Sequence, residues 1–274
     1  MRIWFCSLAL LAGFHVAIAA PQAAQVAGKP AAAKTTVTWF GHAAFRIETP
    51  NGKTLLVDPW ITNPSNPTGA QDVKSVKADL ILVTHGHSDH VGDATDIAKR
   101  TKAKLVATFD LGGAMVAAGF PKELYGMDTG GNFGGTMHLL DDEVAITFVP
   151  AVHSSALGDD KKTFGGNPGG FVIAIKNGPT LYHTGDTDVF GDMAMISKFA
   201  KIDLMLACIG GHFTMDPDRA AEAVRLVKPK QVAGMHFGTF PILTGTPDAF
   251  GKALKKANVG AKLVELGINK PIVL

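Results

Sequence analysis

Short apolar segments recur along this chain from residue 35 onward, and each of them ends in glycine or in polar residues. Residues 35–40, 44–48 and 54–57 have the alternating or continuously apolar pattern that is typical of strands. The Asn51-Gly52 pair between the second and third segments is a hairpin signal. The pattern therefore predicts an antiparallel meander of three strands at the start of the folded region.

Beyond residue 80, apolar strand segments alternate with segments of helical periodicity. The expected strands are residues 80–83, 104–107, 136–140, 144–149, 171–175, 180–183, 202–208, 230–235, 261–265 and 272–274. The expected helices are residues 94–101, 112–118, 193–199, 217–227 and 248–257, and Asp216-Pro217 supplies N-cap and N1 residues for the fourth. A meander followed by this alternation, present twice, predicts an α/β fold with two β-rich halves packed sheet on sheet and helices outside.

The composition is that of one large folded domain. The 274 residues are 46% apolar and 18% charged, so the chain can bury a large core. No internal repeat and no second linker divides residues 35–274, which we interpret as one domain. The formal net charge of +2 argues against a dedicated nucleic-acid-binding protein. A small molecule is the expected partner, and the sequence holds no signal for an oligomeric state.

The first 20 residues have the pattern of a secretory signal peptide. Arg2 supplies the positive charge, residues 8–18 are apolar, and Ala17-Ile18-Ala19 is a small-residue cleavage site. A membrane anchor is the alternative, but the apolar run is short for a bilayer span. Residues 21–34 are expected to be a disordered linker, so the mature protein is predicted to be periplasmic or secreted, without stable membrane insertion.

Candidate chemistry is concentrated where the apolar run at 80–83 ends. His85, His87, Asp89 and His90 lie within six residues, although the whole chain has only ten histidines. Gly86 carries no Cβ, which allows the sharp turn that would bring neighbouring imidazoles together. Imidazole and carboxylate groups suit Zn²⁺ or another divalent transition metal. A polar surface loop that is rich in histidine by chance is the alternative.

Several other expected strands also end at a possible metal ligand. His153, Asp186, His212 and His236 each follow such a strand, and His42 follows the first strand of the meander. Each of these histidines taken singly is more often an ordinary buried or surface residue. Strand ends at one edge of a sheet lie close together in space, however, so the coincidence favours a shared site.

The motif Thr84-His85-Gly86-His87-Ser88-Asp89-His90 resembles the H-x-H-x-D-H signature of the metallo-β-lactamase-fold hydrolases. The resemblance extends over essentially all of residues 35–274. Three further motifs, at residues 39–45, 209–215 and 235–241, are similar to those of bacterial hydrolases related to ascorbate-6-phosphate lactonase. Members with these signatures are usually cytoplasmic, so the export signal is a departure. The resemblance implies a four-layer αββα sandwich with two metal ions at its edge.

The resemblance also implies the ligands of both ions. His85, His87 and His153 would hold the first metal, Asp89, His90 and His236 the second, and Asp186 would bridge them. Asp89 is in addition the candidate catalytic residue. Zn²⁺ is the expected ion, with Mn²⁺ or Fe as alternatives. Two neighbouring dications lower the pKa of a shared water and so provide hydroxide near neutral pH.

The roles of His42 and His212 stay open between two hypotheses. Either each orders a nearby loop by hydrogen bonding, or both face the pocket and bind substrate or shuttle a proton. For Asp58 we expect a structural role in a turn, for Asp188 a surface position, and for His138 and His183 structural or exposed positions. The loop at 61–69 and a mobile, glycine-rich flap at 158–170 are expected to shape the pocket.

Two functions fit these residues. The first is hydrolysis of a small ester, lactone or phosphoester, and the second is non-catalytic metal binding by a periplasmic domain with the same fold. The complete set of ligand types, with both Asp89 and Asp186 present, favours the enzyme. The sequence does not choose between carbonyl and phosphoryl chemistry.

Overall fold

The computed structural model describes residues 1, 34–158 and 162–274. The predicted signal peptide and linker therefore lie almost entirely outside the described residues, and so does the centre of the predicted flap. The chain divides into Met1–Ala32 and Ala33–Leu274, and every helix and strand given below belongs to the second unit. Among the described helices, none has the length and apolar character needed to cross a lipid bilayer.

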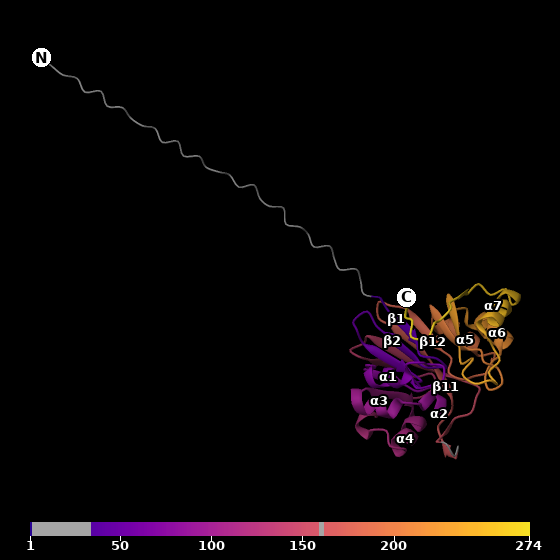
Figure 1. Ribbon diagram of the computed structural model, residues 1–274, viewed down its shortest axis with the longest axis horizontal. Helices are drawn as coiled ribbons and strands as arrows, with labels where there is room; N and C mark the ends of the chain where they lie inside the picture. Colours follow the sequence, from indigo (N-terminus) through magenta and orange to yellow (C-terminus); the bar gives the residue numbers. More distant parts are fainter. Residues whose placement is uncertain (2–33, 159–161) are drawn as a thin grey trace. The chain divides into compact units, whose positions relative to one another are not determined.

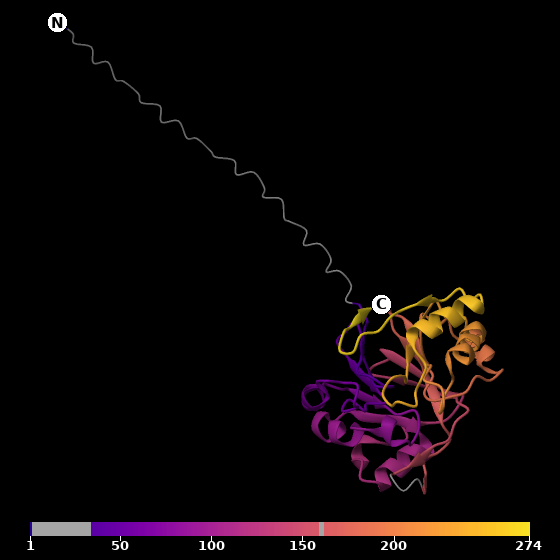
Figure 2. The same ribbon diagram turned by 45° about the vertical axis from the view of Figure 1, so that its right-hand side comes forward.

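Seven strands form the first sheet, in the order β16-β1-β2-β3-β4-β5-β6. The predicted meander is present as the antiparallel strands β1, β2 and β3, and β4 and β5 then add in parallel. In Figure 2 the C-terminal strand, in yellow, lies beside the N-terminal strand, in indigo. The strands are β1 (Thr36–Trp39), β2 (Phe45–Glu48), β3 (Thr54–Val57), β4 (Leu80–Leu82), β5 (Lys104–Thr108), β6 (Gly130–Gly131) and β16 (Ile272–Val273).

The second sheet also has seven strands, in the order β15-β14-β13-β12-β11-β8-β7. Strands β12 to β15 are parallel, whereas β7, β8 and β11 are joined by antiparallel pairing. The strands are β7 (Thr136–Leu139), β8 (Val144–Pro150), β11 (Gly169–Ile175), β12 (Thr180–His183), β13 (Leu204–Cys208), β14 (Gln231–Met235) and β15 (Lys262–Leu263).

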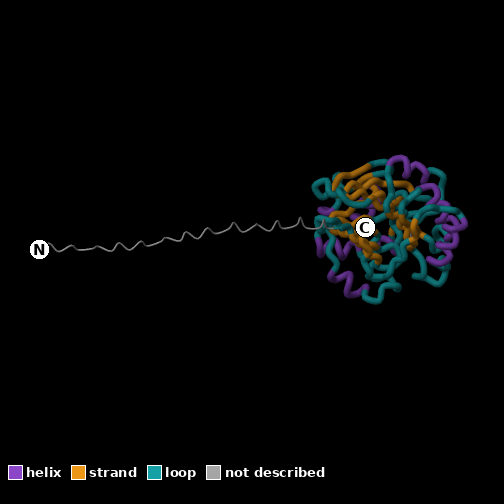
Figure 3. Tube along the Cα trace, turned by 90° about the horizontal axis from the view of Figure 1, so that it is seen from above, coloured by secondary structure: helices purple, strands orange, loops and turns teal. Residues whose placement is uncertain are grey.

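Helices cover the outer faces of the two sheets. Figure 1 shows α1 (Gly69–Ser75), α3 (Ala94–Thr101) and α4 (Phe109–Ala117) on one side of the strands, and α5 (Met193–Phe199), α6 (Pro217–Val227) and α7 (Pro247–Lys256) on the other. Figure 3 shows the same arrangement from above, with strands inside and helices around them. The α/β class and the sandwich of sheets between helices are therefore confirmed. The sequence did not predict α1 or the single turn α2 (Ser88–Val91), because such short helices show no clear periodicity.

The hydrophobic core explains why the strands have the observed patterns. One cluster lies between the sheets and contains Phe45, Leu82 and Phe171. A second cluster lies between the first sheet and its helices and contains Ile81 and Ile97. Neighbouring residues of β4 thus face different cores, which is why this strand is continuously apolar and not alternating. The central strand β4 is held on both faces, and its carboxyl end is correspondingly fixed.

The described part of the predicted flap forms a short hairpin. Strands β9 (Ala156–Leu157) and β10 (Thr163–Phe164) pair antiparallel, and residues 159–161 between them are outside the described ranges. Ser155 fastens the base of this hairpin, since its Oγ accepts from Gly86 N at 3.0 Å and donates to Gly165 O at 2.7 Å. Backbone pairing of this kind needs no apolar side chains, so composition gave no sign of it. The hairpin base is joined directly to the histidine-rich loop.

Candidate metal centre

Four strands from the two sheets end at one common edge. In the second sheet β12 and β14 run parallel, and β8 runs in the same direction because both β8 and β12 are antiparallel to β11. The loops after these three strands carry His153, Asp186 and His236. The segment after β4 of the first sheet carries His85 and His87 in a loop and Asp89 and His90 in the single turn α2. All seven predicted metal ligands therefore lie beyond strand ends at one edge, as the sequence predicted.

The first group of ligands consists of His85, His87 and His153. One ring nitrogen from each lies within 4.8 Å of the others, which is close enough to hold a metal ion. His85 Nε2 is 3.0 Å from His87 Nδ1, and the other ring nitrogen of His85 is 3.0 Å from Thr84 Oγ1. His85 is buried, whereas His87 and His153 are partly exposed. The three imidazoles that the resemblance assigns to the first metal are thus together.

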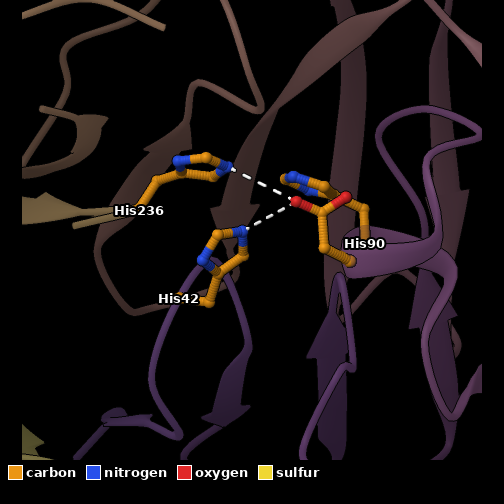
Figure 4. Close-up of side chains that lie close together, drawn as sticks. His42, His90 and His236 are labelled. Atoms are coloured by element: carbon orange, nitrogen blue, oxygen red, sulfur yellow. Dashed lines mark hydrogen bonds and ion pairs between the residues drawn. The ribbon is translucent and has the colours of Figure 1, made fainter. Parts of the chain in front are cut away.

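The second group contains His42, Asp89, His90 and His236, again with ligand atoms within 4.8 Å. Figure 4 shows His42 and His236 directed toward the same carboxylate oxygen, with His90 beside it. That oxygen is Asp89 Oδ2, which is 3.0 Å from His42 Nε2 and 3.8 Å from His236 Nε2. The group includes the three residues assigned to the second metal, and His42 in addition.

Asp186 lies between the two groups. Its Oδ1 is 3.2 Å from His90 Nε2, and its Oδ2 is 3.0 Å from His236 Nε2 and 3.6 Å from His153 Nε2. One carboxylate therefore contacts histidines of both groups. This is the placement that a bridging ligand requires, because each oxygen of a carboxylate can serve a different cation.

The residues fit divalent metal ions. His90 Nε2, Asp186 Oδ1 and His236 Nε2 are buried and make no hydrogen bond of good geometry within the described part of the chain. Buried polar atoms without partners are rare and costly in folded proteins. A cation between the imidazoles and the carboxylate would satisfy these atoms, and their chemistry matches the ligand preferences of zinc and similar ions.

Burial lowers the pKa of some histidines of the site, and neighbouring carboxylates raise the pKa of others. Burial lowers the pKa of His85 well below its usual 6.5 and also lowers the pKa of His153. Burial acts the same way on His236, but the Asp186 carboxylate outweighs it and raises the pKa of His236 to about 9. His90 also has a pKa well above its usual value despite burial, because Asp186 and Asp58 are close. Without metal, His90 and His236 therefore keep their protons to higher pH than His85 and His153 do, whereas burial lowers the pKa of His42 to about 4.

Asp58 holds His90 in place. Its Oδ2 is 2.7 Å from His90 Nδ1, and the carboxylate also accepts from the backbone N–H and the hydroxyl of Thr84, at 2.8 and 2.7 Å. This contact directs the other ring nitrogen of His90 toward Asp186. The sequence predicted a structural role for Asp58 in a turn, and missed its contact with a metal ligand. Asp58 follows β3, and the histidine-rich segment follows β4, the neighbouring strand. The position of Asp58 at a strand end was therefore the available signal for its contact with His90.

We expect Asp58→Asn to weaken metal binding at the second group by about 10- to 100-fold, the usual cost of removing a partner that orients a ligand. Titration of metal into the metal-free protein would measure it. Asp79→Asn is the matched control, because Asp79 Oδ2 accepts a backbone hydrogen bond from Thr54 N at 2.8 Å at the opposite end of the same strand pair. Equal losses of metal affinity in both variants would show that Asp58 acts only on the fold.

His42 is buried and has protein contacts at both ring nitrogens. Nδ1 is 2.9 Å from Thr239 Oγ1, and Nε2 contacts Asp89. Its backbone oxygen accepts from His236 N and from Trp39 Nε1, each at 2.9 Å. His42 thus connects the loop of Asp89 to the loop of His236. Its role in substrate binding stays a prediction, and the contacts themselves place it against a candidate ligand.

His212 differs from the other strand-end residues. Its side chain is exposed and lies edge-on against Phe213, with ring centroids 4.4 Å apart. None of its described contacts is with a predicted ligand, so its substrate-binding role also stays a prediction. The other unassigned polar residues have structural or surface contacts: Asp188 pairs with Arg219, His138 with Asp142, and His183 with Ala43 O and Gly185 N.

Comparison with known proteins gives one consistent result. A family model described as a beta-lactamase superfamily domain matches residues 36–236. A metal-dependent hydrolase of Thermodesulfovibrio yellowstonii is 54% identical over 244 residues, which cover 87% of this chain and 91% of the relative. A metal-dependent hydrolase of an Anaeromyxobacter species is 56% identical over 248 residues, covering 89% and 88%.

Solved structures agree with these sequence matches. A metallo hydrolase of the archaeon Ignicoccus hospitalis superposes with a TM-score of 0.77 at 35% identity, over 88% of this chain and 98% of that one. An isothiocyanate hydrolase from gut bacteria of Delia radicum has a TM-score of 0.65 at 16% identity, over 87% and 98%, and this second likeness concerns the fold alone.

Proposed function

Because this chain belongs to the beta-lactamase superfamily and is a metal-dependent hydrolase, we propose that it cleaves a small ester, lactone or phosphoester with the help of two divalent ions. The observation that carries the proposal is the position of Asp186. Its carboxylate is 3.6 Å from a histidine of the first group and 3.0 Å from one of the second. Such a carboxylate serves a paired centre better than a single site.

Two bound dications would supply hydroxide near neutral pH and polarise the bond to be cleaved. The side chains of this protein fix where that happens. Thr84 and Asp58 orient His85 and His90, while His42 orients Asp89. Imidazole and carboxylate ligands favour Zn²⁺, with Mn²⁺ or Fe as alternatives.

Asp89 is more suited to ligation than to proton transfer. Burial raises the pKa of its carboxyl, but the neighbouring imidazoles of His236 and His42 hold that pKa well below the usual range. A carboxylate with so low a pKa is a weak base at neutral pH. We therefore assign Asp89 the role of holding the second ion and orienting the attacking water, which is how it would act as a catalytic residue.

Metal reconstitution followed by a turnover screen tests this function. We expect elemental analysis to find two ions per chain, and we expect hydrolysis of p-nitrophenyl acetate, a simple lactone or bis(p-nitrophenyl) phosphate to require them. A value that stays at one ion or below would contradict the paired centre. Two ions without turnover of any ester, lactone or phosphoester would contradict the hydrolytic function.

We also propose that the protein is exported, on the basis of the N-terminal sequence alone. Arg2, the apolar residues 8–18 and the site after Ala19 are the supporting features. The mature protein is expected to begin at Ala20 or Pro21 in the periplasm or the medium. N-terminal sequencing of protein from its native host would check this, and a cytoplasmic protein with intact residues 1–20 would refute it.

A further inference from the structure

An aromatic pair borders the second ligand group. Trp60 follows the end of β3, Phe240 follows the end of β14, and their rings are stacked with centroids 5.9 Å apart at 26°. The ring of His42 lies 5.3 Å from Trp60 and 5.8 Å from Phe240. Both aromatic side chains are partly exposed. An apolar surface open to solvent therefore begins beside His42, whose Nε2 contacts Asp89.

Two other loops at this edge, and a second position on the loop of Phe240, also expose large apolar side chains. Val152 is 53% exposed next to His153, Phe213 is 55% exposed, and Ile242 is 45% exposed on the loop that begins at His236. Single exposed apolar residues are common on protein surfaces. Here they occur on successive loops around one candidate active site, which is the arrangement of a binding surface.

Backbone hydrogen bonds join the four loops that follow β8, β12, β13 and β14 to one another. Asp188 N donates to Val152 O at 3.0 Å, and Met215 N donates to Thr187 O at 3.1 Å. Gly245 N donates to Gly210 O at 3.1 Å, which joins the loop of Phe213 to the loop of Ile242. We name this surface the apolar arc and define it by Trp60, Val152, Phe213, Phe240 and Ile242.

The segments that form the apolar arc lack the two strongly basic residue types. Residues 59–69, 150–153, 186–192, 209–216 and 236–246 contain neither lysine nor arginine. Sites that recognise phosphate usually do so with these two residues. Asp188 lies on one of these segments and is paired with Arg219 from the neighbouring helix α6. The arc segments themselves therefore offer mainly apolar contact to the part of a substrate that extends beyond the metal centre.

We propose that the substrate is an uncharged ester or lactone with an apolar arm, alkyl or aromatic, which lies along the apolar arc. The reacting bond then faces Asp186 and the two ligand groups, while the arm covers Trp60 and Phe240. This inference rests on the proposed hydrolytic function and narrows it from esters and phosphoesters in general. Covering exposed apolar surface supplies the binding energy that the absent basic residues do not.

A series of p-nitrophenyl esters tests the arm. With metal-loaded mature protein, kcat/KM is expected to rise at least 30-fold from acetate to octanoate, since each fully buried methylene contributes about fourfold. The rate with p-nitrophenyl phosphate is expected to be lower than with any ester. Hydrolysis of acetate with a flat or falling dependence on chain length would overturn the proposal and leave the hydrolytic function intact.

Matched variants locate the arm. Phe213→Ser combined with Ile242→Ser should lower the ratio of octanoate to acetate kcat/KM about tenfold. Phe199→Ser is the control, because Phe199 is 84% exposed and borders a separate apolar groove of about 540 Å³ between β8 and α5. That variant should keep the ratio of the unmodified protein. A loss of the ratio in Phe199→Ser, with none in the double variant, would place the arm in the groove and overturn the proposal.

Ligand binding measured without turnover distinguishes the proposal of the apolar arc from the proposed hydrolytic function. Residues 21–274 contain two tryptophans, Trp39 and Trp60, and Trp39 is buried. Octanoate should change the fluorescence of the metal-loaded protein at a concentration at least tenfold lower than acetate does, and Trp60→Phe should remove most of the change. Tighter octanoate binding in a protein that cleaves no ester would support the arc and refute the hydrolytic function. Equal binding of both acids would overturn the arc.

Discussion

Asp186→Asn is expected to remove at least one metal ion and to lower hydrolysis by about 10²-fold or more, the order seen when one strong electrostatic stabiliser is lost. The carboxylate contacts His90, His153 and His236 with its two oxygens. Asparagine keeps the shape but offers a single neutral oxygen and an NH₂ group that cannot ligate a cation. Elemental analysis and the rate with the best substrate of the turnover screen would measure both effects.

The fold should survive this change, because the core between the sheets is formed by strand residues such as Phe45 and Phe171. Asp188→Asn is the control two residues away. Asp188 is a partly exposed partner of Arg219, and surface ion pairs of this kind contribute little to stability. Its metal content and rate should stay close to normal. If Asp188→Asn abolishes activity while Asp186→Asn keeps both ions and the rate, the bridging assignment is wrong.

Metal binding at the second group is expected to depend steeply on pH. Metal binding at the first group is expected to depend on pH less. The pKa of His236 is raised to about 9 and that of His90 is also raised, so a metal ion that binds at neutral pH must displace a proton from each. Each displaced proton changes the apparent affinity about tenfold per pH unit, so the loss of both protons gives up to about 100-fold per unit. Affinity therefore rises as pH rises.

The first group behaves differently because burial lowers the pKa of both His85 and His153. These imidazoles lose their protons at lower pH than His90 and His236 do, so fewer protons have to leave them when the metal binds. Calorimetric titration with Zn²⁺ at several pH values, in buffers of different ionisation enthalpy, would count the protons released at each step. One ion per chain at pH 6 and two at pH 8.5 is the expected result, and equal pH dependence of both steps would contradict it.

The sequence alone was sufficient for the order of the longer strands and helices and for the types of residue at the strand ends. Strand and helix periodicity is local, so it predicted the meander, the alternation and the α/β class. Four of the seven ligands lie within six residues of each other after β4, and this spacing is readable without a structure. The loops after β8, β12 and β14 meet the same edge because strand direction follows from topology.

The tertiary structure alone decided which side chains support the ligands. Asp58 lies 32 positions before His90, and Thr239 lies 197 positions after His42, yet each pair is within 2.9 Å. No local pattern marks such pairs, since a side chain in a loop can point in several directions. The aromatic pair of Trp60 and Phe240 likewise brings together two distant loops.

His212 and His236 show the physical reason. Both follow an apolar strand of the same sheet, and both have left-handed backbone conformations, with φ of 52° and 56°. His236 N donates to His42 O at 2.9 Å, so the loop of His236 packs against the first sheet and its ring is buried beside Asp186. His212 lies exposed against its neighbour Phe213. Identical local signals thus reached different environments, because the packing of one loop on another determines where a side chain at a strand end points.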